Sequence, residues 1–170
     1  LRIQKDLESV EGATTDDITV TYRISATNDG SLKGTTGRLT DTPDFAPGLN
    51  VRSAAVATTL EGLASAAVQP AAASYVLTEG ADLEPGQSAT WYIRMRVSRD
   101  KTAAGYNEVA LECATQNDRL RPKNGLYNRV SGNYDHDGES NNEACAPVRP
   151  RPIRIEKAGT QPVGTQNDDG

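Results

Sequence analysis

This chain of 170 residues has few of the residues from which common active sites are built. It contains one histidine and two cysteines, so neither a zinc cluster nor a Ser-His-Asp triad can be assembled around His136, which lies in an acidic turn. The sequence also lacks a G-x-S-x-G turn, a phosphate-binding loop and a dinucleotide fingerprint. We therefore expect no enzyme activity on a substrate.

Clustered positive charge and long apolar runs are also missing. The net charge is -5, and the eighteen Lys and Arg residues are scattered along the chain. Phosphate backbones require clustered basic residues, so we expect no nucleic-acid partner. No apolar run approaches the length that spans a bilayer, so we expect no direct membrane insertion. The chain starts in the middle of a strand pattern, and we expect it to be a fragment of a longer protein.

Alternation of apolar and polar residues is the main pattern. The inward set in residues 18–26 alternates with Thr, Arg and Ser, and residues 88–100 alternate in the same way. Such alternation predicts half-buried strands. Further strands are predicted at 36–41, 49–57, 74–78, 105–113, 125–131 and 143–148. We expect residues 60–74 to hold a turn or two of helix. Many short strands separated by Gly- and Pro-containing turns predict an all-β, immunoglobulin-like antiparallel β-sandwich.

The beginning of the chain is repeated near its end. "LRIQKDLES" at the start resembles "PIRIEKAGTQ" at 152–161, and the Pro-rich stretch 146–152 reads as a stiff, extended spacer. We predict a first module over residues 1–149, with residues 150–170 forming a linker and the start of a following module. The parent protein is then a tandem array.

Lys5 is the first candidate functional residue. In a strand, Leu1, Ile3, Lys5 and Leu7 point to the same side, which places the lysine on an apolar face. A buried ammonium must be paired, lose its proton or be consumed chemically. The alternative is that Lys5 lies at a strand end and extends its amine to water.

Cys113 and Cys145 form the one disulfide that the sequence allows. Both flanks read as strand segments, so a cross-strand bridge is feasible. Closing this loop would stabilise the fold by about 3 to 4 kcal/mol in the chain-entropy model and would indicate an oxidising, extracellular location. The alternative is two reduced core cysteines.

An ordered set of motifs carries a family resemblance. The segments "GATTDDITVTYRISATNDG", "GRLTDTPDFAPGL", "LEPGQSATWYIRMRV", "GLYNRV" and "DGESNNEACAPV" follow one another along residues 1–157. The chain resembles the DUF11-like modules of bacterial surface proteins, which relate to the CnaA-type, immunoglobulin-like domains of Gram-positive adhesins and pilins. The resemblance implies a stalk or adhesive module of a cell-wall-anchored protein.

The resemblance also implies a chemical role for three residues. Many CnaA-type relatives join a first-strand lysine to a late asparagine through an isopeptide bond, assisted by an acid in the strand ending "TDTP". The corresponding residues here are Lys5, Asp41 and Asn128. The extra segment "YNEVALECATQNDRLRPKN" offers Asn107 in an equally suitable phase, so the asparagine stays open between Asn128 and Asn107.

The chemistry follows from burial. Amide formation needs a neutral amine, which an apolar site favours. The same site would keep Asp41 protonated, so that it can polarise the asparagine carbonyl and pass a proton to the departing ammonia. Alternatively, Asp41 is a turn former ahead of Pro43.

The turn "NYDHDGESNNE" offers oxygen ligands for calcium. Asn133, Asp135 and Asp137 alternate ahead of Gly138, and Glu139 and Asn141 could add further ligands. The twelfth position is Ala144 and not the usual glutamate, so a polar hairpin turn is the alternative.

Two functions from different classes follow. The first is a structural or adhesive module, extracellular and anchored to the cell wall, hardened by an isopeptide bond and a disulfide. Its expected partners are a host extracellular protein or other surface-protein modules, and it needs no cofactor. The second is a calcium-dependent carbohydrate- or protein-binding module that uses the loops at 115–125 and 133–142.

Overall fold

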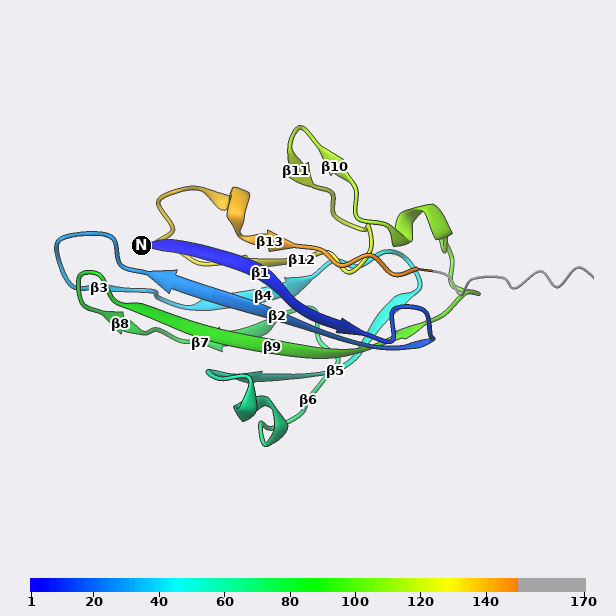
Figure 1. Cartoon of the computed structure of the whole chain (residues 1–170), viewed down its shortest axis with the longest axis horizontal. Coiled ribbons are helices and arrows are strands. Elements are labelled where there is room, and N and C mark those ends of the chain that lie inside the picture. The colour runs from blue at the N-terminus through cyan, green and yellow to red at the C-terminus, as the bar shows by residue number, and fades with distance from the viewer. Residues whose placement is uncertain (150–170) are drawn as a thin grey trace, which may run out of the picture.

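The computed structural model describes residues 1–149 as two antiparallel sheets packed face to face (Figure 1). The predicted linker and second module at 150–170 lie outside the described residues. The first sheet has the strand order β1 (Arg2–Glu11), β2 (Asp17–Thr27), β9 (Ser88–Arg99), β5 (Leu49–Ala57) and β6 (Gln69–Pro70). The second has the order β13 (Glu143–Ala144), β12 (Asn128–Ser131), β4 (Leu39–Pro43) and β7 (Tyr75–Thr78).

This strand order is that of an immunoglobulin-like sandwich. Strands β1, β2, β9 and β5 take the A-B-E-D order, and β4, β12 and β13 take the C-F-G order of the other sheet. The prediction of an all-β, immunoglobulin-like antiparallel sandwich is confirmed. The part of the chain that the structure describes contains no helix long and apolar enough to cross a membrane.

The core lies between the two sheets and is built from the inward residues of the alternating strands. The long central pair β2 and β9 is continuous in register from Asp17 opposite Ser98 to Thr27 opposite Ser88. Their inward side chains are fully or nearly fully buried: Ile18, Val20, Tyr22, Ile24, Ala26, Trp91, Ile93, Met95 and Val97. Period-two alternation thus places these side chains in the core, as the sequence predicts.

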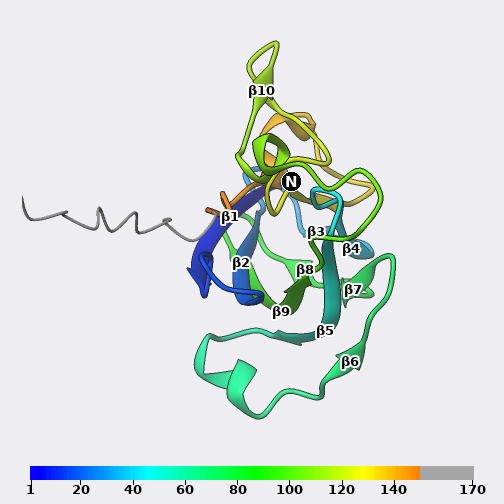
Figure 2. The same cartoon turned by 90° about the vertical axis from the view of Figure 1, so that its right-hand side faces the viewer.

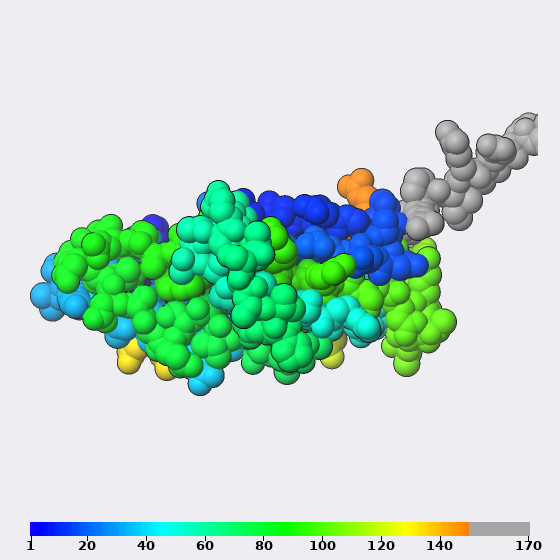
Figure 3. All heavy atoms as spheres, turned by 90° about the horizontal axis from the view of Figure 1, so that it is seen from below, coloured from blue at the N-terminus to red at the C-terminus, as the bar shows by residue number. Residues whose placement is uncertain are grey.

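Two excursions leave the sandwich on opposite sides (Figure 2). The ribbon of β10 (Thr115–Gln116) and β11 (Arg119–Leu120) projects from one side, and the connection from β5 to β7 lies on the other. That connection holds one 3₁₀ turn, η1 (Glu61–Ala64), within the stretch expected to contain a turn or two of helix. Seen from below, it forms a raised layer on the surface of the molecule (Figure 3).

The region between β9 and β12 differs from the prediction. The strand expected at 105–113 is wrong, since this stretch contains the 3₁₀ turn η2 (Glu108–Leu111). The alternating apolar residues here do not share a buried strand face. Leu111 alone among the η2 residues is buried, and Val109 is 78% exposed. Two small paired ribbons and one turn complete the fold. One ribbon is β10–β11, and the other pairs β3 (Gly34–Thr35) with β8 (Asp82–Leu83) at the far end of the sandwich. The turn is η3 (Glu139–Asn141).

Candidate functional site

Lys5 lies in the interior, midway along the edge strand β1. It pairs with Ile24 of β2, and its side chain is 0% exposed. It therefore does not reach water. Ile3 is buried on the same face as expected, but Leu7 is 38% exposed. A register irregularity between Leu7 and Ser9 interrupts the β1–β2 pairing there and ends the inward alternation.

The Lys5 amine meets Asp41 across the core. Asp41 lies in β4 on the opposite sheet, is completely buried, and accepts a hydrogen bond from Lys5 Nζ through Oδ2. The ring of Tyr22 lies against the same amine, with its centroid 4.7 Å from Nζ. Asp41 thus faces an ion-pair partner in the core and does not serve as a surface turn former.

Asn128 completes a cluster of three polar residues in the core. It lies in β12 opposite Pro43, and Asp41 lies opposite Val130, so Asp41 and Asn128 are diagonal neighbours on the inner face of adjacent strands. Asn128 is 0% exposed. Within residues 1–149, its Nδ2 reaches only the Met95 sulfur, at 4.0 Å.

Two oxygen atoms of this cluster are without hydrogen bonds. Asp41 Oδ1 and Asn128 Oδ1 are both buried and have no partner among the described residues. Buried polar atoms in native proteins are normally paired, and an orphaned one costs about 1 to 3 kcal/mol. Each such exception needs an explanation, such as a chemical role or a bound water or ion.

Burial changes the protonation of the groups in the cluster. Removal from water lowers the pKa of Lys5, although the neighbouring Asp41 carboxylate acts in the opposite direction. Burial also raises the pKa of Tyr22 well above its ordinary value, with the Asp41 charge adding to the effect. Tyr22 therefore stays a neutral hydroxyl, while the fraction of neutral Lys5 amine increases.

Asn107 does not belong to this buried cluster. Its side chain is exposed and caps η2 by accepting a hydrogen bond from the Val109 backbone N–H at 2.9 Å. Of the two asparagines that the sequence left open, the structure therefore brings Asn128, and not Asn107, into the interior with Lys5 and Asp41.

Cys113 and Cys145 form the predicted disulfide, with Cα atoms 6.0 Å apart. It joins the end of the η2 segment to the end of β13, so the Cys145 flank is a short strand as expected and the Cys113 flank is not a strand. Gly125 packs directly on the bridge, because a Cβ there would lie 3.0 Å from Cys145 Sγ. The bridged positions enclose Asn128 in the sequence, and Lys5 lies outside them.

The acidic turn lies beside the start of β1. Asp135 accepts a hydrogen bond from the Ile3 backbone N–H at 3.1 Å, while the Asn133 and Asp137 side chains are exposed. Glu139 points to Arg129, with 3.7 Å between Oε2 and Nη1. No group of three or more His, Cys, Asp or Glu side chains within residues 1–149 is placed to hold a metal ion.

Some contributing residues were not identified from sequence. Tyr22 was expected to face inward, but nothing in the alternation indicates that its ring covers an amine. Glu143 was also missed, although it is buried and accepts hydrogen bonds from the Tyr127 hydroxyl at 2.8 Å and the Leu120 N–H at 3.0 Å. These contacts anchor the β10–β11 ribbon, and a Glu at the start of a short strand gives no local sign of them.

Comparison with known proteins gives little similarity. No protein-family model matches the chain, and no curated protein matches it significantly. Among solved structures, the chain is similar to the CBM3a-L domain, with flanking linkers, of scaffoldin cipA from the Clostridium thermocellum cellulosome. The match has 14% identity and a TM-score of 0.30, and it covers 78% of this chain and 85% of that one. Similarity at this level supports no inference about function.

Proposed function

We propose that this chain is a structural module of an extracellular, cell-wall-anchored protein, hardened by an amide bond between Lys5 Nζ and Asn128 Cγ. The burial of Lys5, Asp41 and Asn128 in one apolar interior is the observation that carries the proposal. The resemblance to DUF11-like and CnaA-type modules supports it. A cluster with side chains closed to solvent is suited to a reaction within the fold and not to a diffusing substrate.

The reaction needs one proton transfer before it starts. Lys5 passes a proton to Asp41 through their hydrogen bond, which gives a neutral amine and a neutral carboxyl. The amine lone pair then attacks Asn128 Cγ, and the Asp41 proton stabilises the developing oxyanion.

Collapse of the tetrahedral intermediate breaks the Cγ–Nδ2 bond. Asp41 takes a proton from the attacking nitrogen and returns one to the departing nitrogen, which leaves as ammonia. The product is a secondary amide, and Asp41 ends in the protonated form in which it began the attack. The bond forms once per chain, so the chemistry is maturation and not turnover.

The amide would redirect mechanical force. A pull that enters at β1 and leaves beyond β13 would pass from Lys5 to Asn128 directly. The chain between Lys5 and Cys113 holds the remaining long strands, β2, β5 and β9, and would carry no load. The Cys113–Cys145 bridge supports an oxidising, extracellular location for such a module.

Intact mass measurement of the reduced protein tests the proposal. We expect a mass lower than that of the sequence by one ammonia, and a digest should contain one branched peptide that joins the Lys5 and Asn128 segments. A chain at full mass would overturn the proposal.

A matched pair of variants separates the two asparagines. Asn128→Ala should restore the sequence mass expected for that variant, because the acceptor carbon is removed. Asn107→Ala should still lose one ammonia, because Asn107 caps a surface turn. Loss of ammonia in Asn128→Ala would show that another residue is the acceptor.

A further inference from the structure

The loop between β12 and β13, residues 132–142, contains more hydrogen-bond acceptors than donors. Asp135 accepts at Oδ2 from Asn142 Nδ2 at 2.6 Å. Asp137 accepts at Oδ2 from Asn141 Nδ2 at 3.0 Å. Each aspartate is therefore held by the carboxamide of one asparagine.

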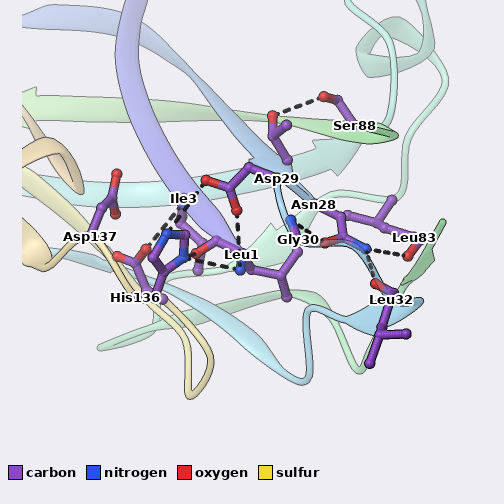
Figure 4. Close-up of polar contacts among 12 residues, drawn as sticks. Leu1, Ile3, Asn28, Asp29, Gly30, Leu32, Leu83, Ser88, His136 and Asp137 are labelled. Atoms are coloured by element: carbon purple, nitrogen blue, oxygen red, sulfur yellow. Dashed lines mark hydrogen bonds and ion pairs between the residues drawn. The ribbon is translucent and has the colours of Figure 1, made fainter. Parts of the chain in front are cut away.

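The two carboxyl groups of this loop are neighbours. Burial, together with the hydrogen-bonding contact to Asp137, raises the pKa of Asp135. Two carboxylates repel each other unless a proton or a cation lies between them. The nearby imidazole of His136 is used elsewhere, because its Nδ1 contacts Leu1 and its Nε2 lies 3.4 Å from Asp29 Oδ2 (Figure 4).

Buried oxygen atoms without donors give an independent indication of a ligand. Asn142 is 1% exposed, and its carboxamide lies against Asp135, yet its Oδ1 has no hydrogen-bond partner among the described residues. The Oδ1 of Asn141 is also buried without a partner. Unpaired acceptor oxygens next to two carboxylates are satisfied by a hydrogen-bond donor or by a cation, and a cation also offsets the negative charge.

We propose that this loop binds one calcium ion through the side-chain oxygens of Asp135, Asp137, Asn141 and Asn142. All four candidate ligands are oxygen atoms, which hard cations prefer, and neither a thiolate nor a free imidazole is available to favour zinc. Carboxylate and carboxamide oxygens in a flexible loop suit the irregular coordination of calcium better than the strict octahedron of magnesium. This set keeps Asp135, Asp137 and Asn141 of the predicted calcium turn, leaves out Asn133 and Glu139, and adds Asn142.

Calcium at this position would fasten the start of β1. The loop already holds that strand through two backbone contacts, Ile3 N–H to Asp135 Oδ1 at 3.1 Å and His136 N–H to the Leu1 carbonyl at 3.1 Å. In Figure 4, His136 lies beside Leu1. An ion that orders residues 135–142 therefore also orders the strand that carries Lys5. Binding itself depends on neither Lys5 nor Asn128.

Calorimetric titration of the whole chain with calcium chloride tests the site, with magnesium chloride as a comparison. Extracellular calcium modules bind at about 0.1 to 1 mM. At a Kd of about 0.1 mM, calcium at about 1 mM makes the unfolding equilibrium about tenfold less favourable. We expect one calcium per chain, weaker binding of magnesium, and slower amide exchange of Ile3 when calcium is present. Absence of heat and of any stabilisation by calcium would overturn the proposal.

Two variants distinguish ligation from general negative charge. Asp137→Asn keeps a side-chain oxygen but removes the negative charge of a proposed ligand at an exposed position, and it should weaken calcium binding about tenfold or more. Glu139→Gln removes the same charge from the same loop, but its carboxylate faces Arg129, so binding should change less than about twofold. Equal weakening in both variants would indicate diffuse attraction and would contradict the proposed ligands.

A luminescent ion provides a check on the unmodified chain. Tyr134 is 55% exposed and precedes Asp135 directly, so it is placed to sensitise bound terbium. Terbium emission should grow to saturation at one ion per chain and fall as calcium is added. If calcium does not reduce the emission, terbium is bound elsewhere, and the result would contradict the proposed site.

Discussion

The Tyr22 hydroxyl donates a hydrogen bond to the Leu126 carbonyl oxygen at 2.6 Å. This contact joins β2 of one sheet to the segment that enters β12 in the other, two residues before Asn128. The ring of the same residue covers the Lys5 amine. Tyr22 therefore contacts the amine on one sheet and fixes the backbone near the carboxamide on the other.

Replacing Tyr22 by Phe should keep the covering ring and remove the hydrogen bond. The Leu126 carbonyl loses a buried donor, so we expect a loss of about 1 to 3 kcal/mol in the free energy of unfolding. Urea denaturation measures this change. Tyr134→Phe is the control, because Tyr134 is 55% exposed and its replacement should cost less than about 0.5 kcal/mol.

Replacing Asp41 by Asn should leave the ammonia on the chain. The isosteric amide cannot accept the Lys5 proton, and it leaves the lysine buried without a counter-charge. Breaking one side of a buried ion pair typically costs about 3 to 5 kcal/mol. Intact mass and thermal unfolding report the two effects. Adding Lys5→Met to this variant should restore part of the stability, and unchanged ammonia loss in Asp41→Asn would contradict the role of the acid.

Stability should depend on pH when Lys5 cannot react. In Asn128→Ala, the folded Lys5 has a lowered pKa, while the unfolded lysine keeps a pKa near 10.5. Between these two values the unfolded chain binds more protons, so the free energy of unfolding should rise with pH, by at most about 1.4 kcal/mol per pH unit.

Urea denaturation from neutral pH to about pH 9 measures this slope, and it stays below the range in which tyrosines ionise. The double variant Asn128→Ala, Lys5→Met is the control, and it should lack the contribution of Lys5. Equal slopes in the two variants would mean that Lys5 does not titrate in this interval.

Removing the disulfide should destabilise the module. Cys113 and Cys145 are 32 residues apart, and opening a loop of that length costs about 4 kcal/mol in the chain-entropy model. The variant Cys113→Ala, Cys145→Ala should therefore unfold at lower urea concentration than the parent. The two should unfold at the same concentration when both are measured under reducing conditions.

Gly125→Ala should be more harmful than a typical glycine replacement. Gly125 has φ of +47°, and an added Cβ would lie 2.6 Å from the Ala146 carbonyl oxygen. Gly86→Ala is the matched control, since its φ is +79° but no atom lies within 4 Å of the added Cβ. Both variants carry backbone strain, and only Gly125→Ala adds a collision. Gly125→Ala should therefore unfold at a lower temperature than Gly86→Ala. Incomplete closure of the disulfide in Gly125→Ala should be detectable by thiol titration.

Much of the fold could be predicted because it depends on local alternation. The prediction for 49–57 coincides with β5, and the inward residues of β2 and β9 are the core. Prediction failed where long-range contacts decide the structure. Residues 105–113 alternate like a strand, yet Asn107 caps a 3₁₀ turn and Cys113 is held by its bridge to Cys145. Leu7 was expected in the core, but pairing with β2 is irregular at that point.

The candidate site was predictable in part for the same reason. Strand phase alone places Lys5 on the apolar face, and the family resemblance implied Asp41 and Asn128. Strand phase could not distinguish Asn128 from Asn107, because each lies in phase with apolar residues at alternate positions of its segment. Asn141 was among the predicted calcium ligands, but the carboxamide of Asn142 was not, since its orientation depends on the contact with Asp135.

The order of the linked residues along the chain is Lys5, Cys113, Asn128, Cys145, so the disulfide and the proposed amide interleave. With both bonds in place, a protease that cuts once anywhere between Lys5 and Cys145 leaves two fragments still covalently attached to each other. A cut before Asn128 is spanned by the amide, and a cut after it is spanned by the disulfide. Such a module would survive nicking in a protease-rich environment without shedding whatever it carries.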